Sequence, residues 1–140
     1  MEVRQFDPSH APSALKRVLV VEDDVGISDI LALVLTSEGY DVARAFTLQQ
    51  ALEAQESVSP DLITLDVDLG GESGLDLLRR LKSDPRRRDV PVLIVSAHVD
   101  RLGGADRRMA AGVIEKPFDI EDLLDRVAAT IGPACPAPAL

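Results

Sequence analysis

The stretch VLVVEDD at residues 18–24 decides the fold, because an apolar run that is nearly all β-branched ends directly in three carboxylates. An unbroken run of this kind is typical of a strand buried on both faces of a parallel sheet. Three later short runs are each followed by a polar or charged residue: 62–65 by Asp66, 92–95 by Ser96 and 113–115 by Lys116. Because the carboxyl ends of parallel strands lie along one edge of a sheet, we expect these side chains to meet in one crevice.

Helical patterns separate these runs and complete the prediction of the fold. The predicted helices run from a cap at Asp24 to a stop at Gly39, from Thr47 to about Glu56, from a cap at Ser73 onward, over roughly 100–111 and from a cap at Asp119 onward. A short, more polar run at 40–45 is expected to form an edge strand. Five successive strand–helix units predict an α/β fold: a doubly wound five-stranded parallel sheet, strand order 2-1-3-4-5, with helices on both faces.

Bulk composition bounds the class of protein. The 140 residues support one domain, and its core must be aliphatic because hydrophobic residues make up 46% and aromatic residues only 3%. A net charge of −9 argues against a nucleic-acid-binding surface, and no apolar stretch reaches membrane-spanning length. Cys135 is the only cysteine, so no internal disulfide can form. We therefore expect a cytoplasmic protein that binds neither nucleic acid nor membrane.

The expected domain covers residues 17–131 and lies between two tails. Residues 1–16 show no hydrophobic periodicity and predict a flexible N-terminal tail. Residues 132–140 carry three prolines, which cannot continue a helix, and predict a Pro-rich C-terminal tail or the stub of a linker.

Five short segments, taken together, resemble one known family. They are VVEDD at 20–24, LDVDL at 65–69, SGL at 73–75, PVLIVSA at 91–97 and EKPF at 115–118. In their order and spacing the chain resembles the receiver domain of two-component response regulators, similar to the chemotaxis regulator. The resemblance implies a flavodoxin-like (βα)5 fold and a signalling function.

The resemblance also implies the chemistry of the crevice. Asp66 would accept a phosphoryl group from a phosphohistidine on a sensor histidine kinase or a histidine phosphotransfer protein. Crowded carboxylates repel one another, so their natural counterion is a hard divalent cation, Mg²⁺ above all. The resemblance implies Asp23 and Asp66 as direct ligands, Glu22 through a water molecule, and the backbone carbonyl of Asp68. Asp24 is expected to cap the following helix instead.

Two further residues complete the implied site. Lys116 would aim its ammonium at the phosphoryl oxygens, and its peptide bond to Pro117 is cis in the family. Ser96 would donate its hydroxyl to the phosphoryl group and move on phosphorylation. The ordinary alternative for Ser96 is a buried serine bonded to the backbone.

The chain departs from the family at several positions. Gly70 stands where the family usually has proline, and with Gly71 it is expected to loosen the loop after Asp66. The segment from Ser96 to Lys116 is a few residues short. Val113 replaces the aromatic residue that takes part in switching, so we expect phosphorylation to change the structure less than in typical receivers, or through other residues.

Asp68 and His98 lie two residues beyond the acceptor and the hydroxyl. In the family these positions flank the path of the hydrolytic water, so a polar pair could position water and shorten the lifetime of the acyl phosphate. The alternative, two solvated loop side chains, stays open.

Three classes of function remain in view. The leading hypothesis is a stand-alone receiver, a monomer or weak dimer, that catalyses only its own phosphorylation and dephosphorylation. It would act on a downstream protein target, or as a phosphate shuttle or sink. A second hypothesis is a receiver-like interaction module that is never phosphorylated. A third is a phosphatase similar to haloacid dehalogenases, suggested by the pair Asp66 and Asp68 after an apolar strand.

Overall fold

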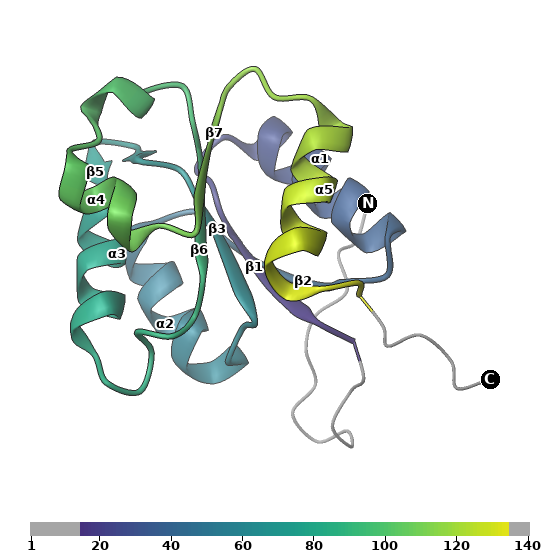
Figure 1. Ribbon diagram of the computed structural model, residues 1–140, viewed down its shortest axis with the longest axis horizontal. Helices are drawn as coiled ribbons and strands as arrows, with labels where there is room; N and C mark the ends of the chain where they lie inside the picture. Colours follow the sequence, from purple (N-terminus) through teal and green to yellow (C-terminus); the bar gives the residue numbers. More distant parts are fainter. Residues whose placement is uncertain (1–14, 135–140) are drawn as a thin grey trace.

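A parallel sheet of five strands forms the centre of the computed structural model, which describes residues 15–134 (Figure 1). The strands are β1 (Arg17–Val21), β2 (Asp41–Ala45), β3 (Leu62–Leu65), β6 (Val92–Ser96) and β7 (Gly112–Glu115). Their order in space is β2-β1-β3-β6-β7, and every pairing between them is parallel. Counted along the chain this is the predicted order 2-1-3-4-5, so the predicted fold class is confirmed.

Helices cover both faces of the sheet, as Figure 1 shows. The helices α1 (Val25–Ser37) and α5 (Ile120–Ile131) lie on one face. On the other face lie α2 (Leu48–Val58), α3 (Gly74–Ser83) and the short α4 (Gly104–Met109). Each layer of helices packs on the sheet through its own cluster of buried aliphatic side chains.

The strand β1 shows why its apolar run has no polar breaks. Leu19 and Val21 belong to the buried cluster under α2 and α3, whereas Val18 and Val20 belong to the cluster under α1 and α5. Successive side chains of a strand point to opposite faces, so a strand covered on both faces needs an apolar residue at every position. The buried apolar run ends at Val21, and the first carboxylate, Glu22, is buried as well.

Four helices begin at the predicted residues. In each, a side-chain oxygen of the N-cap residue accepts a hydrogen bond from a backbone N–H of the first turn, which satisfies a donor that the helix itself leaves free. The N-cap residues are Asp24, Thr47, Ser73 and Asp119. Asp24 is thus the helix cap that the sequence predicted.

The helix predicted over roughly 100–111 is confirmed only in its second half, and its start is wrong. The chain forms a 3₁₀ turn, η1 (Val99–Arg101), and then α4, which has only six residues. Between them Gly103 adopts an extended conformation, with φ −80° and ψ 172°, and its N–H donates to Asp106 Oδ2 at 3.3 Å. Glycine has a low helix propensity, and the extended Gly103 separates the 3₁₀ turn from the helix that begins at Gly104.

The expectation that Gly70 and Gly71 loosen the loop after Asp66 is also wrong. The loop is a β-hairpin, with β4 (Asp68–Leu69) paired antiparallel to β5 (Glu72–Ser73). Gly70 and Gly71 form its two-residue turn and both have positive φ, 59° and 96°. A tight hairpin turn of this kind requires positive φ at both positions, so the two glycines close the loop.

The packed part of the chain extends beyond residues 17–131. The N–H of Lys16 donates to the carbonyl of Ala134 at 2.8 Å, and the Tyr40 hydroxyl donates to the carbonyl of Gly132 at 2.9 Å. Residues 132–134, expected in the C-terminal tail, therefore pack against the domain. Residues 1–14 and 135–140, with most of both predicted tails and Cys135, lie outside the described residues.

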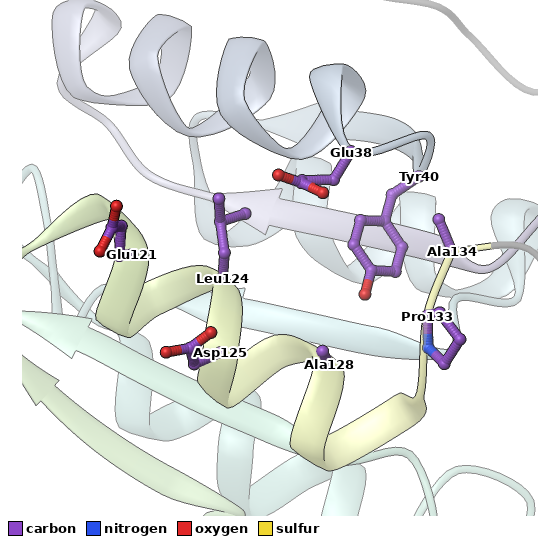
Figure 2. Close-up of a pocket in the computed structure, with 8 residues that line it drawn as sticks. All are labelled: Glu38, Tyr40, Glu121, Leu124, Asp125, Ala128, Pro133 and Ala134. Atoms are coloured by element: carbon purple, nitrogen blue, oxygen red, sulfur yellow. The ribbon is translucent and has the colours of Figure 1, made fainter.

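A cavity of about 320 Å³ lies beside this junction, between α1, α5 and the segment after α5 (Figure 2). Glu38, Tyr40 and Ala134 are among its lining residues, and it shares none with the carboxylate crevice described below. Among residues 15–134, no helix has the length and apolar character needed to cross a membrane.

Candidate functional site

The carboxyl ends of four parallel strands place the predicted side chains at one edge of the sheet. Glu22 directly follows β1, Asp66 follows β3, Ser96 ends β6 and Lys116 follows β7. The backbone fixes their register, because the N–H of Asp66 donates to Val21 O at 3.0 Å and the N–H of Lys116 donates to Ser96 O at 2.9 Å. Residues separated by as many as 94 positions in the chain are thereby brought into contact.

Three carboxylates form the centre of this edge. Glu22, Asp23 and Asp66 each offer an oxygen, and these oxygens lie within 4.8 Å of one another. Glu22 and Asp66 are buried, with 2% and 6% of their surface exposed, whereas Asp23 is exposed. Carboxylate oxygens in such a group suit a hard divalent cation, which would offset their mutual repulsion.

The Lys116 ammonium joins two of these carboxylates. Its Nζ donates to Asp66 Oδ2 at 2.9 Å and also donates to Glu22 Oε1. Burial lowers the pKa of Lys116, but the hydrogen bonds that Lys116 donates to Glu22 and Asp66 outweigh burial and raise that pKa above its ordinary value. Lys116 is therefore a permanent cation in this crevice. The peptide bond between Lys116 and Pro117 is cis.

The two buried carboxylates differ in their affinity for a proton. Burial is the largest influence on the pKa of Glu22 and raises it to about 7, although Lys116 opposes the change. Burial also acts to raise the pKa of Asp66, but hydrogen bonds from Lys116 and from the N–H of Asp68, 3.1 Å from Asp66 Oδ1, lower it overall. Asp66 is therefore ionised at neutral pH, as a nucleophile requires, and Glu22 carries the proton when one binds.

Ser96 is fully buried at the end of β6. Its Oγ accepts a hydrogen bond from the N–H of His98 at 3.1 Å, which is the backbone contact of the ordinary alternative. Within residues 15–134 the hydroxyl proton has no hydrogen-bond acceptor, so the group can still donate to an oxygen bound nearby. The backbone contact and a donor role are thus compatible.

Asp68 and His98 face each other across the mouth of the site. His98 Nε2 lies 3.9 Å from Asp68 Oδ2, and 42% and 45% of the two side chains are exposed. Val113 lies apart from them, on β7, where it packs on the core under α2, α3 and α4. Its carbonyl accepts a hydrogen bond from Arg126 at 3.1 Å.

Two glycines matter to the site in ways that sequence analysis missed. A Cβ at Gly74 would lie 2.0 Å from the backbone oxygen of Asp66, so no side chain fits there. A Cβ at Gly70 would lie 3.5 Å from Asp23 Oδ2, which places this glycine beside the carboxylates. The SGL segment at 73–75 marked Gly74 as a family position, but the sequence alone does not show that the Asp66 carbonyl lies against it.

Residues 18–128 match the sequence profile of the response regulator receiver domain. The chain belongs to the response regulator receiver family. This receiver domain is similar to the DNA-binding dual master transcriptional regulator RpaA of Synechocystis, with 38% identity over 122 residues that cover 84% of this chain and 49% of that protein. The chain spans about half the length of the curated relatives it matches.

Solved structures agree on the fold. A sensor protein from Polaromonas aligns with a TM-score of 0.77 and 30% identity, over 83% of this chain and 95% of that one. The response regulator TrrA from Thermotoga maritima, solved in complex with Mg²⁺ and BeF, aligns with a TM-score of 0.75 and 27% identity, over 83% and 99% of the two chains. The receiver fold of this chain is therefore shared with experimental structures.

Because the pKa of Glu22 is raised to about 7, we expect cation binding at these carboxylates to depend on pH. Below about pH 7 a proton occupies Glu22 and competes with a cation, and above that pH the carboxylate is free. We expect the Mg²⁺ dissociation constant, measured by calorimetric titration, to fall by about tenfold between about pH 6 and about pH 8. The variant Glu22→Gln should show a much flatter profile. A flat profile in the wild type would contradict the assignment of the proton to Glu22.

Proposed function

We propose that this receiver domain accepts a phosphoryl group on Asp66 from the phosphohistidine of a sensor histidine kinase or a histidine phosphotransfer protein, in a reaction that requires Mg²⁺. The observation that carries the proposal is the contact of 2.9 Å between Lys116 Nζ and an Asp66 carboxylate held ionised within a group of three carboxylates. An ionised oxygen, a fixed cation and a cation-binding group in one crevice are the parts that phosphoryl transfer needs.

The transfer is a substitution at phosphorus. An oxygen of the Asp66 carboxylate forms a bond to phosphorus while the phosphorus–nitrogen bond of the donor breaks, and the electron pair of that bond goes to the imidazole nitrogen. The product is an acyl phosphate. In the dephosphorylation step, a water oxygen forms a bond to phosphorus while the bond from phosphorus to the Asp66 oxygen breaks. Inorganic phosphate leaves, the proton of the water goes to the phosphate or to solvent, and Asp66 regains its carboxylate.

The chain's own residues prepare these steps. Lys116, already paired with Asp66, stays beside the new phosphoryl oxygens and offsets their charge. Ser96 offers its free hydroxyl proton to the same group. The carboxylates of Asp23 and Asp66 and the backbone carbonyl of Asp68 would hold Mg²⁺, with Glu22 acting through water. When bound, the ion would neutralise charge on the phosphoryl oxygens.

The proposed role in the cell follows from the same chemistry. The domain would catalyse only its own phosphorylation and dephosphorylation, in the cytoplasm, as a monomer or weak dimer. The phosphorylated domain would bind a downstream protein, or the domain would serve as a phosphate shuttle or sink. Relatives of twice the length are named as DNA-binding regulators. The absence of nucleic-acid binding by this chain therefore stays a prediction.

The proposal is tested by incubating the protein with acetyl phosphate and Mg²⁺ and measuring its intact mass. We expect one added phosphoryl group on the wild type, none on Asp66→Asn, and none when a chelator removes the metal. Unlabelled wild type under all conditions would favour the interaction module that is never phosphorylated. Repeated turnover of a generic phosphate ester would favour the phosphatase.

The pair formed by Asp68 and His98 is proposed to tune the lifetime of the acyl phosphate. The two polar groups lie 3.9 Å apart and partly exposed, so a water between the loops can be held close to Asp66. We expect Asp68→Met and His98→Met each to slow dephosphorylation by about tenfold, less than the roughly 100-fold or more of a full general acid or base, because the pair would only position the water. Loss of labelled protein after removal of the donor gives the rate. Unchanged rates in both variants would remove this role.

A further inference from the structure

The two glycines of the β4–β5 turn stand in different surroundings. A Cβ at Gly70 would lie 3.5 Å from Asp23 Oδ2, an ordinary contact distance, whereas a Cβ at Gly71 would meet nothing within 4 Å. Both residues have positive φ, so the turn presents them in similar strain-free backbone. One position of the turn therefore faces the carboxylate group, and its neighbour faces solvent.

The hairpin holds Gly70 in place against Asp23. Asp68 pairs with Ser73 and Leu69 pairs with Glu72 in the two short strands. Leu69 is buried in the core, with 2% of its surface exposed. The N–H of Asp68 also donates to Asp66 Oδ1 at 3.1 Å, which ties the start of the hairpin to the acceptor. These contacts fix the position of the Gly70 backbone beside the Asp23 carboxylate.

The group of carboxylates is open to solvent at Asp23, beside which Gly70 lies. Glu22 and Asp66 are buried and both contact the Lys116 ammonium, so that side of the group is already occupied. Asp23 is the one exposed member of the three, and Gly70 lies next to it. A side chain at position 70 would therefore contact the exposed carboxylate of the group.

We propose that Gly70 determines the cation specificity of this site by leaving the space beside Asp23 to water. The inference rests on the proposed metal-dependent function and goes beyond it. With no ligand from position 70, the protein offers few oxygens and water completes the coordination shell. Mg²⁺ is small, dehydrates reluctantly and keeps several waters, whereas Ca²⁺ takes six to eight oxygens in a flexible shell. A bare position 70 thus disfavours Ca²⁺ relative to Mg²⁺.

The test adds an oxygen ligand at position 70 and compares two ions. Gly70→Asp places a carboxylate beside Asp23. Gly71→Asp is the control with the same charge one residue away, where a Cβ has nothing within 4 Å. Calorimetric titration of the unphosphorylated protein gives the dissociation constants for Mg²⁺ and Ca²⁺. We expect Gly70→Asp to tighten Ca²⁺ binding by about tenfold and Mg²⁺ binding by clearly less. Gly71→Asp should change both ions slightly and equally.

Gly70→Asn is the second variant, because asparagine followed by glycine is favoured in this type of turn and adds a neutral oxygen. It should also shift the preference towards Ca²⁺, by less than aspartate does, with an unchanged thermal unfolding midpoint. Equal ratios of Ca²⁺ to Mg²⁺ affinity in the wild type and in both position-70 variants would overturn the inference. Failure of the wild type to bind Mg²⁺ would instead contradict the proposed function.

Discussion

The Lys116 ammonium between Glu22 and Asp66 is the interaction on which the rest of the site depends. Two buried carboxylates with a third beside them repel one another, and burial penalises each negative charge. At an effective dielectric constant of about 20, one ammonium–carboxylate pair about 4 Å apart gains roughly 4 kcal/mol of Coulomb energy before desolvation. Lys116 contacts both buried carboxylates and keeps Asp66 ionised. One ammonium does not offset the burial of both negative charges, so the pKa of Glu22 is raised to about 7.

The parallel arrangement of the strands makes the contact between Lys116 and Glu22 possible. Lys116 follows β7 at one side of the sheet and Glu22 follows β1, and the two strands β3 and β6 lie between them. Only strands that run parallel bring their carboxyl ends to one edge. The aliphatic residues that fill both faces of the sheet therefore serve the site, because they fix the register in which acids, hydroxyl and ammonium meet. The hairpin after Asp66 and the close packing at Gly74 then fix the loop that carries the acceptor.

Much of this could be predicted from the sequence because it depends on local patterns. The apolar runs gave the strands, and the caps at Asp24, Thr47, Ser73 and Asp119 gave the helix starts. What was missed has two causes: glycine pairs that allow several conformations, and contacts between distant segments. Gly103 separates a 3₁₀ turn from the helix that begins at Gly104, whereas Gly70 and Gly71 close a turn. The packing of residues 132–134 depends on partners such as Tyr40, 92 positions away.

A crystal structure of the protein with Mg²⁺ and beryllofluoride, a stable mimic of the phosphoryl group, tests the central claim most directly. The account predicts beryllium bonded to an Asp66 oxygen, with fluorine atoms in contact with Lys116 Nζ and Ser96 Oγ, and the metal between Asp23 and Asp66. Beryllofluoride bound at another residue, or a Lys116 ammonium that turns away from the bound group, would contradict it.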